Sequence, residues 1–257
     1  MYTVAVIGLG SRGRNYGGHL NAMPDVKITS VCDKYQAKID NVKSAWKLDD
    51  KACFTDEDAF FAQGKVADIM VIATQDKDHY GHAMKALGLG YDLLLEKPVS
   101  PNIAECLEIE KYAREHNRKV LVCHVLRYAN YYRKIKELLD SGVLGDVKLI
   151  KHDEHISWWH FCHSYVRGNW RREEDTSPML LAKCCHDMDL LYWFAGAKCK
   201  SLSSYGSLSF FNSDNAPEGA ADSCFDCKYK DECIYECAYQ YVGRGCKKNK
   251  FPWGTYA

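Results

Sequence analysis

The sequence lacks three features that would each define a specialised class of protein. No apolar run approaches the ~18 residues that a membrane-spanning helix needs. Net charge is also absent, because 34 basic residues balance 34 acidic ones, and a dedicated nucleic-acid-binding protein is usually basic. Internal repeats and low-complexity tracts are missing, and no basic leader precedes the apolar segment that begins at Thr3. We therefore expect a globular cytoplasmic protein with neither membrane nor nucleic-acid partners.

Cysteine, by contrast, is abundant, with 13 residues in 257. The odd number and the missing leader indicate a reducing compartment, where clustered thiols bind metals more often than they form disulfides. The densest group has the spacing C-x2-C-x5-C-x3-C, which suits a tetrahedral zinc site. Its members are Cys224, Cys227, Cys233 and Cys237, and Cys246 lies near enough in sequence to replace Cys237. Zinc, an iron–sulfur cluster and a set of reduced thiols all stay open as interpretations.

Residues 1–125 alternate between short apolar runs and helical stretches. The runs at 3–7, 26–32, 68–73, 91–95 and 119–124 are typical of strands that are buried on both faces. Such alternation predicts a doubly wound parallel sheet.

Two Ser-Pro pairs predict helix starts. Ser100-Pro101 and Ser177-Pro178 each have a serine suited to the N-cap and a proline suited to the first helical position. The second pair predicts a helix over 179–195 that ends at Gly196. The expected buried stripe of that helix is Leu181, Cys184, Cys185, Met188 and Tyr192.

A glycine-rich turn follows the first predicted strand. In the segment from Gly8 to Gly13, the glycines allow a tight turn, close approach of a pyrophosphate and close packing of helix on strand. The phosphates would then lie at a helix N-terminus, which favours anions. Asp33 ends the second predicted strand, 20 residues after Gly13, where a carboxylate can accept hydrogen bonds from ribose hydroxyls. That carboxylate favours NAD, and the adjacent Lys34 leaves NADP open.

Five segments in this order resemble the Gfo/Idh/MocA family of NAD(P)-dependent oxidoreductases, most of which act on sugars, polyols and related compounds. They are Gly8–Gly13, Ala73–His79, Glu96–Pro98, His124–Tyr128 and His186–Asp189. The resemblance implies a Rossmann-type nucleotide-binding domain over 1–125. It also implies a substrate-binding α+β domain over 126–257, which contains the Cys-rich segment 224–246.

The family's second domain has an open, mostly antiparallel sheet whose face often pairs subunits, so a homo-oligomer is expected. Family members usually run well beyond 257 residues. The chain is therefore either a shortened natural form or a fragment, and the second sheet is expected to be incomplete. The expected cofactor-binding residues are Gly8, Gly10, Ser11, Arg12, Gly13, Asp33, Thr74, His79, Glu96 and Lys97.

Three residues are candidates for acid–base catalysis: Lys97, His186 and Lys183. Lys97 follows a predicted strand at its carboxyl end, where open α/β sheets bind ligands, and the resemblance places it near the nicotinamide and the substrate hydroxyl. The ordinary pKa of histidine, ~6.5, suits proton transfer at neutral pH. Many family members have an aspartate four residues before this histidine, but Ala182 occupies that position here. Which of the three is the base therefore stays open.

The segment 152–172 is rich in histidine, tryptophan and arginine. Aromatic faces stack on sugars, and arginine and histidine bind polar or anionic groups, so a sugar-like ligand is expected. The His-x-x-His spacings at 152/155 and 160/163 do not favour a metal, because strand positions three apart face opposite ways. The expected substrate-binding residues are Arg127, Tyr128, His163, Tyr165, Arg167, Trp170 and Asp187.

Three functions fit these patterns. The leading hypothesis is an NAD-dependent oxidoreductase that acts on a secondary alcohol of a sugar, polyol or sugar derivative. The second is an NAD-dependent glycosidase that uses transient oxidation and elimination and forms no net NADH. The third is a catalytically impaired protein that only binds the cofactor.

Overall fold

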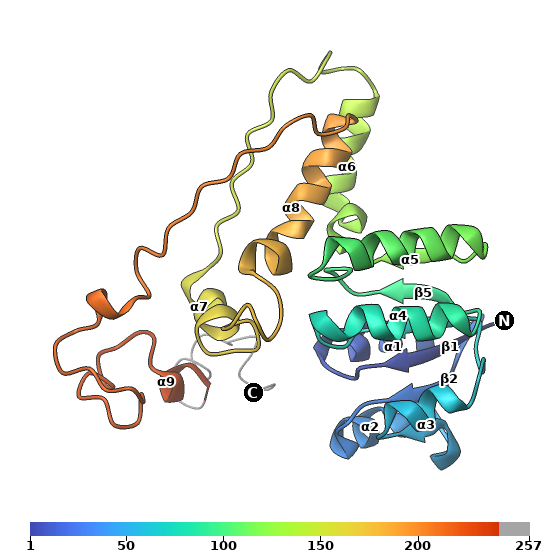
Figure 1. Cartoon of the computed structure of the whole chain (residues 1–257). Helices are drawn as coiled ribbons and strands as arrows, with labels where there is room; N and C mark the ends of the chain where they lie inside the picture. Colours follow the sequence, from blue (N-terminus) through green and yellow to red (C-terminus); the bar gives the residue numbers. More distant parts are fainter. Residues whose placement is uncertain (242–257) are drawn as a thin grey trace. The chain divides into compact units, whose positions relative to one another are not determined.

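A parallel sheet forms the N-terminal part of the chain (Figure 1). It has six strands in the order β3-β2-β1-β4-β5-β6. The computed structural model describes residues 1–241. The strands are β1 (Tyr2–Ile7), β2 (Val26–Cys32), β3 (Cys53–Phe54), β4 (Ile69–Ile72), β5 (Asp92–Leu95) and β6 (Val120–Val122). The doubly wound sheet is thus confirmed, and the two-residue β3 is the strand that the sequence pattern did not predict.

Helices cover both faces of this sheet because its strands are apolar on both sides. Along β1, Val4 and Val6 belong to the apolar cluster formed with α1 (Ser11–Asn21) and α2 (Gln36–Lys43). The alternate residues Ala5 and Ile7 belong to the cluster formed with α3 (Glu57–Ala62), α4 (His79–Gly88) and α5 (Ile103–Glu115). Alternation along the strand therefore gives each face its own core.

The start of α5 differs from the prediction. Asn102 is the N-cap, and its side chain accepts a hydrogen bond from the backbone N–H of Ala104 at 2.9 Å. The hydroxyl of Ser100 instead donates to the Glu105 carboxylate. The predicted Ser100 cap was wrong because the hydroxyl has a charged acceptor within reach, and the asparagine next to the helix serves as the cap.

The helix predicted over 179–195 is confirmed as α8 (Met179–Ala195), which ends at Gly196 with φ 61°. Its cap was predicted wrongly, because Ser177 donates its hydroxyl to Asp76 and Pro178 takes the N-cap position without a side-chain hydrogen bond.

The buried stripe of α8 was also wrong. Met188 and Tyr192 are 47% and 54% exposed. The buried face consists of Ala182, His186, Asp187 and Leu190, and α8 packs against α6 (Asn130–Asp140) and the turn Val125–Tyr128. The face that carries ionisable groups is thus the one turned inward.

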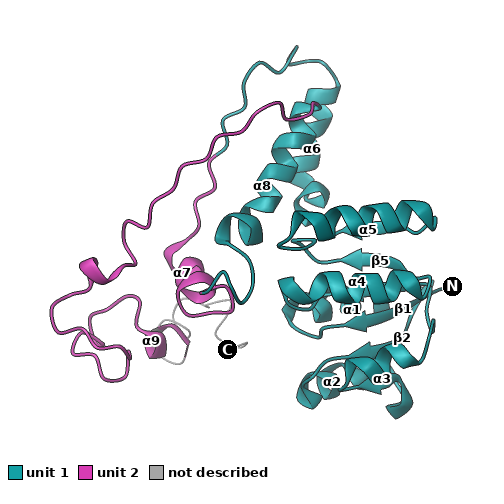
Figure 2. Ribbon diagram, in the orientation of Figure 1, with its two compact units in different colours: residues 1–152, 172–196 teal, residues 153–171, 197–257 magenta. Residues whose placement is uncertain are grey.

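The chain divides into two compact units (Figure 2). Unit 1 comprises residues 1–152 and 172–196, and unit 2 comprises residues 153–171 and 197–257. Unit 2 contains α7 (Trp158–Phe161), a π-helical turn (Cys162–Val166), a 3₁₀ turn (Ser213–Asn215) and α9 (Cys237–Tyr241). The boundary expected after residue 125 separates a nucleotide-binding part from a substrate-binding part, and this division by function stays a prediction.

The expected antiparallel sheet is not formed in the described part of the second half. Between residues 123 and 241 no strand is present, and the stretches 147–157 and 198–209 have no regular structure. A strand requires a neighbouring ladder, and these stretches are not paired with one another or with the Rossmann sheet. Among the helices of residues 1–241, none has the length and apolarity to span a bilayer.

Two adjacent glycines of α1 predict opposite effects of the same substitution. A Cβ at Gly17 would lie 2.3 Å from Cη2 of the buried Trp46, whereas a Cβ at Gly18 would meet nothing within 4 Å. We expect Gly17→Ala to lower the free energy of unfolding by about 1–3 kcal/mol through overpacking, and Gly18→Ala to raise it by about 0.5–1 kcal/mol. Urea unfolding of both variants measures the difference, and equal midpoints would contradict the packing.

Candidate functional site

A cavity of about 280 Å³ opens at the carboxyl ends of β1, β2 and β4. It is lined by the glycine turn, by the end of β2 and by the loop after β4, all within unit 1. This is the edge at which open α/β sheets bind ligands. Its lining includes Gly8, Gly10, Asp33, Lys34, Lys38, Glu57, Thr74 and His82.

The glycine turn is shaped by close backbone contacts. Gly8 has φ 88°, and a Cβ there would lie 2.5 Å from the Ala73 carbonyl oxygen. A Cβ at Gly13 would lie 1.8 Å from the Gly8 carbonyl oxygen. Gly10 differs, because a Cβ there meets nothing within 4 Å, and as N-cap of α1 it provides no side-chain hydrogen bond. The helix start is therefore open to an anion, as the spacing predicts.

Asp33 is buried at the end of β2. Its Oδ2 accepts a hydrogen bond from the backbone N–H of Leu9 at 2.7 Å, and its Oδ1 accepts one from the backbone N–H of Tyr35 at 3.0 Å. Lys38 Nζ lies 3.4 Å from Oδ2. The carboxylate is thus held beside the glycine turn, and Lys38 is a cavity residue that sequence reasoning missed.

Polar contacts link three side chains that line the cavity, Glu57, His82 and Thr74. The Glu57 carboxylate lies 2.7 Å from Nε2 of the buried His82, and Nδ1 of His82 lies 3.0 Å from the Thr74 hydroxyl. This pattern assigns the proton to Nε2, so that Nδ1 accepts from Thr74. His82 lowers the pKa of Glu57, chiefly by this hydrogen bond. No sequence motif indicated Glu57 or His82.

His79 is buried, and both of its ring nitrogens contact backbone carbonyl oxygens. Its Nδ1 lies 2.7 Å from the Pro98 carbonyl oxygen, and its Nε2 lies 3.3 Å from the Thr74 carbonyl oxygen. We interpret His79 as a support that joins the loop after β4 to the turn after β5.

Glu96 and Lys97 follow β5. The buried Glu96 carboxylate accepts hydrogen bonds from the Tyr16 hydroxyl of α1 and from the Lys97 backbone N–H at 2.9 Å. Arg12 Nε lies 3.9 Å from the same carboxylate. Burial and the charge of Glu96 raise the pKa of Tyr16. Lys97 then extends to α8, where its Nζ donates to the Ala182 carbonyl oxygen at 2.9 Å.

His186 lies buried on the same face of α8. Burial, and next the Lys97 ammonium, lower its pKa to about 4. Its ring is edge-on to His124, with centroids 6.0 Å apart. The Nδ1 atoms of both histidines are buried and have no hydrogen-bond partner among residues 1–241. His124 was not predicted as a site residue, although it begins the segment His124–Tyr128.

Two carboxylates of α8 have basic partners. Asp187 accepts from Nε2 of His152 at 2.7 Å through Oδ1, and its buried Oδ2 has no partner in the described chain. Asp189 receives a bidentate pair from Arg127, with both distances 2.7 Å. Arg127 therefore joins the turn 125–128 to α8, and Tyr128 beside it is exposed. Lys183 is half-buried on the same helix.

The other predicted substrate-binding residues lie in unit 2. Arg167 donates to the Tyr235 carbonyl oxygen at 2.8 Å and to Gln240 Oε1 at 2.9 Å. His163 Nδ1 lies 2.9 Å from the Tyr241 hydroxyl. Tyr165 and Trp170 belong to the same unit. Arg167 and His163 thus link α9 to the segment after α7. A role of all four residues in substrate binding stays a prediction.

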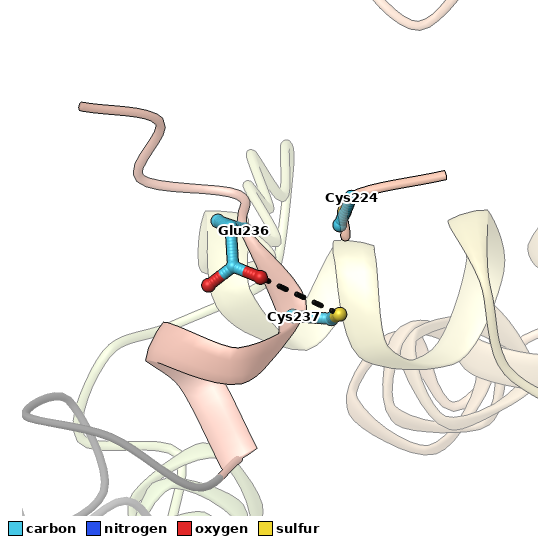
Figure 3. A group of neighbouring side chains, drawn as sticks. All are labelled: Cys224, Glu236 and Cys237. Carbon is cyan, nitrogen blue, oxygen red and sulfur yellow. Dashed lines mark hydrogen bonds between the residues drawn. The ribbon is translucent and has the colours of Figure 1, made fainter. Parts of the chain in front are cut away.

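The predicted four-thiol group is only partly assembled. Cys224, Glu236 and Cys237 converge, with one ligand atom from each lying within 4.8 Å of the others (Figure 3). Cys227 and Cys233 are not part of this group, and Cys246 lies outside the described residues. Loop spacing alone did not show that a carboxylate next to the last thiol would take part.

Comparison with known proteins gives the lineage of both parts. Residues 2–124 match the oxidoreductase family profile described as an NAD-binding Rossmann fold, and residues 136–253 match its C-terminal alpha/beta domain. YteT of Bacillus subtilis, an oxidoreductase by name, is 28% identical over 185 residues, which are 70% of this chain and 43% of YteT. Inositol 2-dehydrogenase of Salmonella typhimurium is 24% identical over 206 residues, 78% of this chain and 56% of the enzyme.

Solved structures agree on the fold. Scyllo-inositol dehydrogenase from Lactobacillus casei, with bound NAD(H) and scyllo-inositol, matches with a TM-score of 0.65 at 22% identity, over 76% of this chain and 56% of that one. The chain spans about half the length of the curated relatives that it matches. The two family profiles together cover most of its residues, and the chain belongs to the Gfo/Idh/MocA oxidoreductase family.

Proposed function

We propose that the chain binds NAD at the carboxyl edge of its sheet and oxidises a secondary alcohol of a polyol or sugar. One observation carries the proposal. Lys97, at the end of β5, hydrogen-bonds to α8 beside the buried His186, whose pKa is lowered to about 4. A cation and a neutral base thus lie together at the edge of a dinucleotide-binding sheet. The inositol dehydrogenases among the relatives favour polyols as the substrate class.

The residues at the glycine turn fit a dinucleotide. The open position at Gly10 leaves room for a pyrophosphate over the start of α1. Asp33 lies in the cavity, where a ribose would meet a carboxylate acceptor. Lys34 and Lys38 line the same cavity. Their positive charge would attract the 2′-phosphate of NADP, so NADP is the second candidate cofactor.

The side chains divide the proton chemistry between them. When bound, NAD supplies the acceptor for the hydride that leaves the alcohol carbon. His186 is neutral at pH 7, so in the reaction that we propose a ring nitrogen of this residue accepts the hydroxyl proton. The Lys97 ammonium stabilises the oxygen as negative charge develops on it. Lys183 contributes positive charge, since it too lowers the pKa of His186.

The decisive assay follows NADH with a panel of polyols and sugars. We expect NADH to accumulate with the wild-type chain and to be lost in Lys97→Met, which keeps the side-chain length and removes the charge. Lys111→Met, on the exposed side of α5, is the matched control. Glycoside cleavage without net NADH would support the second hypothesis instead, and NAD binding with no turnover in any condition would support a protein that only binds the cofactor.

Alanine substitutions at two glycines test the effects on folding and on cofactor binding separately. Gly10→Ala introduces no clash within the protein, so we expect an unchanged unfolding midpoint and NAD affinity weakened by at least about tenfold, because the methyl group occupies the place of the pyrophosphate. Gly13→Ala would place a methyl group against the Gly8 carbonyl oxygen, so we expect stability and binding to fall together. Calorimetric titration and thermal unfolding measure both quantities. Undiminished NAD binding by Gly10→Ala would refute the placement of the cofactor.

The depressed pKa of His186 predicts an unusual pH profile. The neutral form of the base persists down to a pH of about 4, so kcat/KM for oxidation should stay level between pH 7 and pH 5.5. An acid limb near ~6.5, the ordinary value for histidine, would contradict this assignment. His186→Gln should lower kcat by roughly 10²–10⁴-fold while the fold persists.

The same group predicts a stability change that is independent of turnover. Below pH ~6.5 the unfolded chain protonates this histidine while the folded chain does not, so the free energy of unfolding should fall as the pH drops toward 4. His186→Gln should flatten that slope. Urea unfolding at several pH values measures it.

A further inference from the structure

Unit 2 has no cluster of fully buried apolar side chains among its described residues; its aromatic rings, such as Phe161, Phe211 and Tyr235, contact one another but are only partly buried. Both buried apolar clusters of the structure lie in unit 1. The buried side chains of unit 2 are a thiol and polar groups: Cys162, Ser164, Glu236 and Gln240. Small units without a sufficient core usually need a disulfide or a metal to hold their fold.

Unit 2 has one group of side chains that could bind a metal ion among the described residues of that unit, formed by Cys224, Glu236 and Cys237 (Figure 3). Glu236 is only 6% exposed, and its Oε1 accepts from the backbone N–H of Ala238 at 2.8 Å. Cys237 Sγ lies 3.6 Å from the same oxygen. The three side chains come from two places in the chain, the loop at 224 and the start of α9, so a bond from each to one ion would join them.

The distances suit a single tetrahedral ion. Two thiolates on one zinc ion, each bound at about 2.3 Å, lie roughly 3.8 Å apart. The ligand atoms of the three residues already lie within 4.8 Å of one another, so shifts of about an ångström complete the geometry.

We propose that unit 2 binds one thiophilic divalent cation, of the zinc type, through Cys224 Sγ, Cys237 Sγ and a carboxylate oxygen of Glu236. The ion is structural: it joins the loop at 224 to α9. This set of three protein ligands differs from the four thiols that the spacing indicates, because it contains Glu236 and neither Cys227 nor Cys233. A water molecule would complete the tetrahedron at the fourth position. The proposal is independent of the reaction, since no catalytic candidate belongs to the group.

The first test needs no substitution. The reduced full chain is titrated with Co²⁺ and then Zn²⁺, and metal content is measured by mass spectrometry. We expect one equivalent of Co²⁺, a thiolate-to-cobalt charge-transfer absorption and its loss on addition of Zn²⁺. A reduced, folded chain that takes up no equivalent of either metal would overturn the proposal, as would a Cys224–Cys237 disulfide that is the stable state under reducing conditions.

Variants then identify the ligands. Cys224→Ser and Cys237→Ser should abolish stoichiometric binding, and Glu236→Gln should weaken it by at least about tenfold. Cys199→Ser, an exposed thiol of the same unit outside the group, is the matched control and should bind as the wild type does. Binding that survives Cys224→Ser or Cys237→Ser, or that is lost in Cys227→Ser and Cys233→Ser but intact in Glu236→Gln, would refute this ligand set.

Discussion

The close approach of backbone at Gly8, Gly13 and Ala73 is the constraint on which unit 1 depends. With Cβ positions 1.8 Å and 2.5 Å from carbonyl oxygens, only glycine lets α1 begin directly over the end of β1. The same helix carries Tyr16, whose hydroxyl bonds the buried Glu96 carboxylate. Glu96 in turn holds the backbone N–H of Lys97. The position of the proposed catalytic lysine thus depends on a glycine contact between the end of β1 and the start of α1.

Electrostatics explain how two basic side chains share one buried place. Lys97 and His186 cannot both be charged cheaply there, because burial and mutual repulsion each disfavour the second cation. The histidine is the group that stays neutral, because burial and the Lys97 charge lower its pKa to about 4. Its neutral ring then carries a lone pair that can accept a proton. The pair therefore presents a cation and an unprotonated ring at neutral pH.

How well a feature could be predicted from the sequence depends on how far apart in the chain its interacting residues lie. The strands, the glycine turn, Asp33 and the extent of α8 depend on neighbours within a few residues or on strict spacing, and the structure places them as predicted. The Ser177 cap failed because Asp76, its partner, is 101 residues away. The polar chain from Glu57 to His82 joins separate helices and leaves no local signal. In α8 the apolar stripe was chosen by hydropathy, whereas packing buried the ionisable face.

Ala182 shows how a departure from the family pattern changes the site. An aspartate at this position would add a carboxylate to the residue that accepts from Lys97, but here the ammonium bonds only its neutral main-chain carbonyl oxygen, at 2.9 Å. An ammonium has three N–H donors, and this carbonyl oxygen accepts from one of them without adding a negative charge. The Lys97 charge disfavours protonation of His186, and in the reaction that we propose it would stabilise an oxygen of the substrate. Because this acceptor is backbone, the contact of the Lys97 ammonium with α8 depends on the path of the helix and not on the side chain at position 182.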